Sequence, residues 1–356
     1  MPDLKEHSLE TLPSDKLTAF LTASDYNLLY ASSNYLRMLQ RFLEAEVLLI
    51  TAETRGELQA VFPVMIYSKS ALGVVCNSLP FYGSNGSIIV GPGLSERESE
   101  RIQRLILEYY NDLVQNRLAC ISSTLITNPL RPDAIAFYDR EAKYNYIEDR
   151  IGQITRLPEH FEKLMPMFAD PRPRNIRKAI KENVRVNWSQ DEADIDFLYE
   201  THWANITSIG GIPKERRFFD LLSSYFQPSD YRIYIAEHGG RKVGALLLFY
   251  FNKTVEYYTP AVVEEARSLQ PTSLIIYEAM KDSISMGYKN WNWGGTWLSQ
   301  GGVYDFKKKW GTTDFPYRYY CHLRDPRLKL LTRETLLKEF PYFYVVPFRE
   351  LEGQQG

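Results

Sequence analysis

Cysteine and long apolar runs are scarce in this sequence of 356 residues, and each scarcity excludes a class of protein. The three cysteines lie far apart and form no C-x-x-C pair, which argues against a disulfide framework and against zinc-binding spacings. The longest apolar stretch, 243–251, is much shorter than the ~20 residues that span a bilayer. Residues 1–16 are polar and acidic, unlike a signal peptide. We therefore expect a soluble cytoplasmic protein without a transmembrane segment or a metal site.

The chain also has no large excess of positive or negative charge, because the formal net charge is only -2. A protein that coats nucleic acid is expected to be basic, so this balance excludes bulk DNA binding but leaves room for a local basic patch. Hydrophobic residues make up 44% of the chain and charged residues 24%, which are ordinary values for a globular protein. The length exceeds that of one hydrophobic core, so two domains are expected.

One order of elements occurs twice along the chain. Alternating apolar runs separated by short turns predict sets of strands over 46–78 and 231–260. Each set is followed by an amphipathic helix, with apolar residues at helical spacing in 102–113 and 276–284. A further apolar strand follows each helix. The repetition predicts two copies of one α/β (α+β) architecture, each a mixed, mostly antiparallel sheet flanked by helices.

The join between the copies is expected in the polar stretch 151–170, because Pro171 and Pro173 then open a new helix. The predicted divisions are an N-terminal extension (1–25), a first domain (26–155), a second domain (156–325) and a C-terminal helical tail (326–356). Apolar residues in 323–348 are spaced for a helix, and we expect this tail to cap the core of the second domain.

Two groups of residues have both a chemical and a structural interpretation. The helix after Pro171 carries a basic face that suits a phosphate group, but a solvated surface helix has the same pattern. Its basic residues are Arg174, Arg177, Lys178 and Lys181. His202 lies on an apolar helical stripe, where a core histidine is favoured over a general base because nothing in the sequence supplies it with a partner.

The segment 290–297 (Asn-Trp-Asn-Trp-Gly-Gly-Thr-Trp) has the alternation of a strand. Trp291 and Trp293 would be buried on one face, and the asparagines would lie on the other. Gly294 and Gly295 would let a ligand approach the backbone closely. A second glycine pair then opens a short helical segment at Gly301, an arrangement that suits an anion.

Taken in order, several segments resemble the FemAB-like branch of the GNAT acyltransferase superfamily, and specifically its BioF2-like acetyltransferase domain. The resemblance covers about 26–323, and its most specific part is Gly-x-Tyr-x-Phe-Lys at 302–307 followed by Trp310-Gly311. The other segments are 77–86, 174–181, 202–213 (HWANITSIGGIP), 217–219 and 271–287.

The resemblance implies tandem GNAT-like domains and an N-acyltransferase, with cell-envelope or polysaccharide biosynthesis as the expected setting. Members of this family transfer aminoacyl groups from aminoacyl-tRNA, or acyl groups from other activated donors, to amines. Acyl-CoA or aminoacyl-tRNA is then a co-substrate, and no cofactor is tightly bound. The expected partners are a small-molecule or glycan-precursor amine and, for the second donor, the 3′ end of a tRNA.

The resemblance also assigns roles to residues around a cleft between the domains. Lys307 and Tyr304 are the expected catalytic residues. Donor-binding positions are Phe306, Gly294, Gly295, Gly301 and Gly302. Acceptor-binding positions are Arg174, Arg177, Tyr82 and Ser84.

The sequence departs from its relatives in two places. It lacks the helical-hairpin insertion of some members, and 267–272 (Arg-Ser-Leu-Gln-Pro-Thr) stands where coenzyme A-dependent enzymes carry a glycine-rich pyrophosphate loop. The donor is therefore open, and so is the general base, for which Glu256, Asp305 and Glu278 are candidates. A non-catalytic binding or scaffold protein of envelope assembly is the alternative, although an intact 302–307 element argues against a decayed site.

Overall fold

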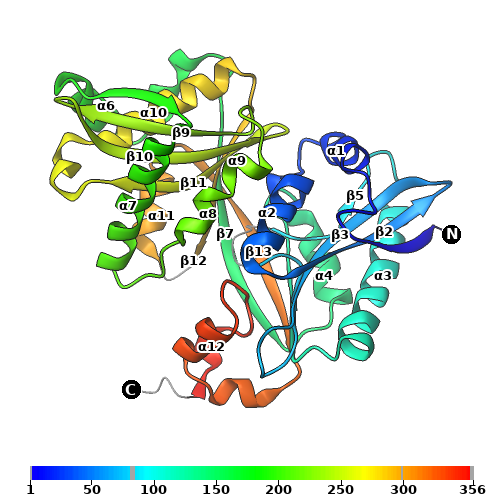
Figure 1. Ribbon diagram of the computed structural model, residues 1–356. Coiled ribbons are helices and arrows are strands. Elements are labelled where there is room, and N and C mark those ends of the chain that lie inside the picture. The colour runs from blue at the N-terminus through cyan, green and yellow to red at the C-terminus, as the bar shows by residue number, and fades with distance from the viewer. Residues whose placement is uncertain (1, 81–84, 298–299, 353–356) are drawn as a thin grey trace. The chain divides into compact units, whose positions relative to one another are not determined.

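The computed structural model describes residues 2–80, 85–297 and 300–352, and the chain forms two compact units. Unit 1 contains Met1–Ile151 and Phe315–Gly356, and unit 2 contains Gly152–Asp314. Strand β7 (Tyr146–Arg156) leads from unit 1 into unit 2, and strand β13 (Thr312–Leu323) leads back (Figure 1). No helix among the described residues is both long and apolar enough to cross a membrane.

The C-terminal tail belongs to unit 1, which differs from the expectation that 323–348 caps the second domain. The reason is a long-range pairing: β13 runs antiparallel to β6 (Ser122–Ile126) from Tyr319 opposite Ile126 to Leu323 opposite Ser122. Beyond β13, the Tyr344 hydroxyl donates to Glu148 and the Cys321 thiol donates to the carbonyl of Val345 at 3.1 Å. These contacts hold the tail, including α12 (Arg333–Glu339), on unit 1.

The strands of unit 1 follow the order β1-β2-β3-β4-β6-β13-β7, with β5 pairing separately with β3. Their bounds are Asp3–His7 for β1, Glu46–Thr54 for β2, Glu57–Tyr67 for β3, Val75–Asn77 for β4 and Ile89–Val90 for β5. The α-helices before the tail are α1 (Ser14–Thr22), α2 (Ser33–Leu43), α3 (Glu96–Asp112) and α4 (Ile135–Glu141). In α3 a capping box of Ser95 and Glu98 fixes the start of the helix, and the predicted apolar stripe is buried through Ile102, Ile106 and Tyr110.

The strands of unit 2 follow the order β7-β12-β11-β10-β9-β8. Their bounds are Arg185–Ser189 for β8, Tyr231–His238 for β9, Arg241–Phe251 for β10, Thr254–Val262 for β11 and Asn290–Trp297 for β12. The α-helices are α5 (Leu164–Met167), α6 (Arg172–Lys181), α7 (Glu192–Ser208), α8 (Arg216–Asp220), α9 (Leu222–Tyr225), α10 (Pro271–Ser285) and α11 (Gly301–Lys308). The strands predicted over 231–260 and the helix predicted over 271–287 therefore exist where expected.

Both units contain the predicted repeat. In unit 1 the parallel strands β4 and β6 are joined by a connection that includes α3, and in unit 2 the parallel strands β11 and β12 are joined by α10. In each unit the first strand of the parallel pair also runs antiparallel to a long hairpin strand, β3 in unit 1 and β10 in unit 2. One architecture has thus been built twice.

The core of unit 2 gathers three tryptophans between the sheet, α6 and α10. Trp291 and Trp293 point from β12 into this core, as the alternation of the strand predicted, and Trp310 lies against Trp293 with ring centroids 5.8 Å apart. The side chain of Asn292 lies on the opposite face of β12, where it donates to Glu256 at 2.8 Å. Trp310 also contacts Phe168 edge-on at 4.9 Å, so its ring joins the sheet to the segment that precedes α6.

We predict that Trp310→Ala lowers the free energy of unfolding by about 3–5 kcal/mol, because a fully buried ring leaves a cavity that the core cannot fill. Urea unfolding followed by fluorescence measures this change. Trp203→Ala is the matched control, since that ring is 44% exposed on α7 and its loss should cost less than about 1 kcal/mol. Equal losses in the two variants would contradict the assignment of Trp310 to the core.

Candidate active site

Strands β11 and β12 pair over a short length and then part. The parallel pairing covers three residue pairs, from Thr254 opposite Asn290 to Glu256 opposite Asn292. Beyond that point β11 continues to Val262 and β12 to Trp297, without pairing between them. A bulge at Tyr258, where β11 slips against β10, bends the strand in the same region. The ends of the two strands therefore leave a gap in the sheet.

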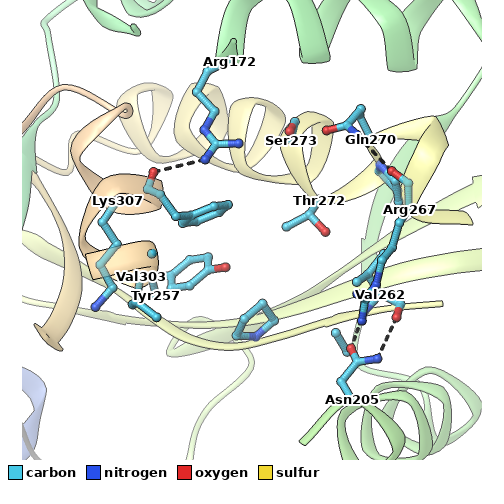
Figure 2. Close-up of a pocket in the computed structure, with 15 residues that line it drawn as sticks. Arg172, Asn205, Tyr257, Val262, Arg267, Gln270, Thr272, Ser273, Val303 and Lys307 are labelled. Atoms are coloured by element: carbon cyan, nitrogen blue, oxygen red, sulfur yellow. Dashed lines mark hydrogen bonds between the residues drawn. The ribbon is translucent and has the colours of Figure 1, made fainter. Parts of the chain in front are cut away.

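Beside this gap lies a cavity of about 520 Å³, a size typical of small-molecule sites. Tyr257 and 260–262 of β11 form one wall, and the start of α10 forms another through 270–273 (Figure 2). The remaining walls come from α11, through Gly302, Val303, Phe306 and Lys307, and from Asn205, Arg267 and Arg172. The side-chain amide of Asn205 donates to the carbonyl of Val262 and accepts from its N–H, both at 2.9 Å, which fixes the end of β11.

The first turn of α10 presents hydrogen-bond donors to the pocket. Pro271 occupies the first helical position, where its missing N–H costs nothing, and Thr272 carries the first backbone N–H of the helix. The hydroxyl of Thr272 points into the cavity (Figure 2). Because the first N–H groups of a helix have no partner within it and carry its positive end, this turn favours an anionic ligand.

The charged side chains that line the pocket are all cationic. They are Arg172, Arg267 and Lys307, and no Asp or Glu is found among the lining residues that the structure describes. Arg267 is exposed near Gln270, whereas Arg172 and Lys307 are buried (Figure 2). A pocket with this charge suits a ligand that carries negative charge.

Lys307 is buried and is held by neutral oxygens. Its Nζ donates to the carbonyl of Gly295 at 3.1 Å and to the hydroxyl of Thr296 at 2.9 Å, and the Thr296 hydroxyl donates to Gln153 at 3.1 Å. Burial lowers the pKa of Lys307 to about 8. The side chain therefore populates both its charged and its neutral form near neutral pH, which suits a group that transfers a proton.

Two comparisons with known proteins bear on this geometry. Residues 172–308, which include most of the pocket, match the family model described as an acetyltransferase (GNAT) domain. This part of the chain is therefore similar to GNAT acetyltransferase domains. No curated protein matches the sequence.

Solved structures show that the whole chain has the tandem GNAT fold. The structure of FemX superposes with a TM-score of 0.71 at 13% identity, covering 92% of this chain and 99% of that one. A tandem GNAT protein from the clavulanic acid biosynthesis pathway gives 0.54 at 12% identity, with coverages of 91% and 99%. The C-terminal domain of a putative lysylphosphatidylglycerol synthetase from Agrobacterium fabrum also gives 0.54 at 12%, with coverages of 91% and 96%. The FemAB-like resemblance agrees with these neighbours.

The GNAT domain brings some of the predicted site residues together and leaves others apart. Lys307, Phe306 and Gly302 line the pocket, and their roles toward a donor stay predictions. Gly294, Gly295 and Gly301 are not among the lining residues, although the carbonyl of Gly295 holds Lys307. Gly294 has a φ of +72°, so its role in the structure is to turn β12 where it leaves β11.

Tyr304 is the predicted catalytic residue that the structure places elsewhere. Its hydroxyl donates to Asp314 at 2.6 Å, and Lys308 contacts the same carboxylate oxygen at 3.1 Å. Tyr304 does not line the pocket, and the hydrogen bond to Asp314 raises its pKa. These contacts tie α11 to the start of β13, so its part in the chemistry stays a prediction that the pocket geometry does not support.

The predicted acceptor residues also lie away from the pocket or outside the description. Arg174 and Arg177 are exposed on α6 and do not line the pocket. Tyr82 and Ser84 fall within 81–84, outside the described residues. The acceptor assignments therefore stay predictions.

None of the candidate bases lines the pocket. Glu256 is buried and accepts from Asn292, Glu278 pairs with Lys281 at 2.7 Å, and Asp305 is exposed on α11. His202 is a buried core histidine whose Nε2 accepts the backbone N–H of Lys214 at 3.1 Å, and burial lowers its pKa to about 3. The general base remains unassigned.

Several residues of the pocket were not predicted from the sequence, among them Arg267, Thr272, Arg172 and Tyr257. Arg267 and Thr272 stand in the segment already noted as a substitute for the pyrophosphate loop, and this position was the available signal for them. Arg172 begins α6 two residues before the predicted basic face, and Tyr257 lies within a predicted strand. Nothing local distinguishes either of them, since only folding brings them to the pocket.

We predict that Lys307 makes the stability of the protein depend on pH. Its folded-state pKa of about 8 lies below the ordinary value of 10.5, so between these values the unfolded chain binds more protons and stability rises with pH. Lys307→Met lacks this contribution. The wild type should therefore gain stability relative to the variant between pH 8 and 10.5, by at most on the order of 3 kcal/mol.

Urea unfolding of both proteins at several pH values measures this difference. Lys214, whose pKa burial also lowers to about 8, is present in both proteins and cancels in the comparison. A difference in stability that stays constant across the window would mean that Lys307 titrates normally.

Proposed function

We propose that the protein is an N-acyltransferase that moves an acyl or aminoacyl group from an activated donor to the amine of an acceptor. The observation that carries this proposal is the cationic pocket at the parting of β11 and β12, with Lys307 buried beside it. A donor with phosphate groups fits the charge of the pocket and the start of α10. The match of 172–308 to a GNAT domain supports the same reaction class.

In the proposed reaction the neutral amine attacks the carbonyl carbon of an ester or thioester held in the pocket. A new C–N bond forms, and the carbonyl electron pair moves onto oxygen to give a tetrahedral oxyanion. When the oxyanion collapses, the C–O or C–S bond to the donor breaks. The amine loses one proton and the departing oxygen or sulfur gains one, so protons balance. Positioning the two reactants can contribute about 7–11 kcal/mol of the rate enhancement.

Lys307 serves this reaction through its charged form. The ammonium group neutralises the developing oxyanion or gives a proton to the departing oxygen or sulfur, and a pKa of about 8 makes that transfer accessible at neutral pH. The hydrogen bonds to Gly295 and Thr296 hold the nitrogen in place before the substrate arrives. Preorganisation of this kind is what makes electrostatic stabilisation effective.

We favour an acceptor amine that belongs to the cell envelope. One structural neighbour is described as a lysylphosphatidylglycerol synthetase domain, a name that denotes an aminoacylated membrane lipid, and another is FemX. Both acyl-CoA and aminoacyl-tRNA stay in the proposal as donors.

We predict that Lys307→Met lowers the rate of acyl transfer by about 100-fold or more, because one general acid or oxyanion partner contributes this much. The rate is measured as acylated amine formed from the donor that the wild type accepts. Lys309→Met is the matched control, since Lys309 lies outside the pocket and should retain full activity. Full activity in Lys307→Met would remove this residue from the mechanism.

The donor is tested by offering acyl-CoA and aminoacyl-tRNA separately to the wild type with a panel of amines. Use of tRNA should weaken steeply with salt because phosphate contacts release counterions. Use of acyl-CoA should depend less on salt. A folded protein that transfers from neither donor to any amine, while binding envelope components, would favour the scaffold alternative.

A further inference from the structure

Arg172 is a buried cation without a counter-ion among the described residues. Its side chain is 9% exposed, and it forms no ion pair with any carboxylate in the part of the chain that the structure describes. Nη2 donates to the carbonyl of Phe306 at 3.3 Å, and Nε has no partner there. Burial lowers the pKa of Arg172, and the group that opposes this shift is the phenol of Tyr257, which is not a carboxylate. Buried charges in proteins are normally paired, so this arrangement calls for an explanation.

Two aromatic rings hold the guanidinium in one orientation. It lies over the ring of Phe306 at 4.2 Å and over that of Trp310 at 5.3 Å. The backbone N–H of Arg172 donates to Ala169 at 3.0 Å, which fixes the start of α6. One edge of the group is occupied by the Phe306 carbonyl, and another extends into the pocket (Figure 2). The guanidinium is therefore preorganised with donors directed into the pocket.

The guanidinium of Arg172 lies beside the first turn of α10. Helix α6 packs on α10 in the core of unit 2, and Arg172, Thr272 and Ser273 line the same pocket. This is also the region where the chain has 267–272 instead of a glycine-rich loop. The other two cations are placed differently: Lys307 donates to the oxygens of Gly295 and Thr296, and Arg267 is exposed.

We propose that Arg172 binds an oxyanion of the donor, a phosphate or a carboxylate, between the ring of Phe306 and the first turn of α10. This inference rests on the proposed function, because it names the residue that holds the donor in the same pocket. A planar guanidinium binds the paired oxygens of a phosphate or a carboxylate through parallel charge-assisted hydrogen bonds. In a glycine-rich loop, backbone N–H groups would donate the hydrogen bonds instead. The ligand also provides a counter-ion that no carboxylate in the described part of the chain supplies.

The test is titration calorimetry of the whole protein with pyrophosphate, inorganic phosphate and succinate. We expect Arg172→Met to weaken binding by roughly tenfold to a hundredfold, the effect of losing a charge-assisted hydrogen bond. Arg241→Met is the control: it removes the same charge from the exposed first residue of β10, outside the pocket, and should bind like the wild type. Loss of phosphate or pyrophosphate binding alone identifies a phosphate as the ligand group, and loss of succinate binding alone identifies a carboxylate. Equal affinities in Arg172→Met and the wild type, or binding of none of the three, overturn the proposal.

A second measurement covers the case in which Arg172→Met does not fold. Crystals of the wild type soaked in selenate should show an anomalous peak within hydrogen-bonding distance of the Arg172 guanidinium, and its absence there overturns the proposal. Neither measurement needs turnover. If transfer activity is found but Arg172→Met binds the oxyanions as the wild type does, only this inference fails. If oxyanion binding depends on Arg172 but neither donor is used, only the proposed function fails.

Discussion

Two parallel strands of unit 2 pair over three residues and then separate, and the pocket depends on that separation. The last shared position is fixed by a side-chain hydrogen bond, in which Asn292 of β12 donates to the buried carboxylate of Glu256 in β11. The oxygen of the same amide accepts the N–H of Gly294 at 3.0 Å, where a φ of +72° turns the strand. The start of α10, the end of α11 and Arg172 gather around the resulting gap, so these contacts position the site without touching a ligand.

Unit 1 shows what happens when the same gap is closed. Its parallel strands β4 and β6 part after Asn77 and Thr124, but the following segment of chain bonds across the opening. The N–H of Ser78 donates to Thr124 at 2.8 Å, the Ser78 hydroxyl accepts the N–H of Ile126 at 2.9 Å, and the N–H of Gly86 donates to Ile126 at 3.1 Å. A Cβ on Gly86 would lie 2.7 Å from the Ser78 hydroxyl, so this close approach requires glycine. The duplicated fold thus leaves one gap open beside a pocket and fills the other with its own backbone.

The sequence pattern predicted those elements that depend mainly on neighbouring residues. Alternation predicted the strands around β10 and β11 and the buried tryptophan face of β12, and helical spacing predicted α3 and α10. The return of β13 to unit 1 depends on pairing with a strand almost 200 residues earlier, which has no local signal. Tyr304 and Lys307 share a motif, but the carboxylate of Asp314 binds the Tyr304 hydroxyl, whereas Lys307 donates to Gly295 and Thr296. Motif order therefore identified the helix of the site, whereas the role of each side chain depended on the fold.

The two buried cations of the pocket respond to burial in different ways, and this difference divides their roles. An ammonium group can lose its proton, so Lys307 is accommodated by two neutral oxygens and a pKa of about 8. A guanidinium stays charged at any physiological pH, so neutral surroundings cannot relieve Arg172 in the same way. Stacking on Phe306 and Trp310 offsets part of the cost of burial, and a negatively charged ligand offsets the rest. The ammonium of Lys307, whose charge can change, suits a reaction step in which charge develops and disappears. The guanidinium of Arg172, whose charge is permanent, suits a part of the substrate that stays anionic throughout the reaction.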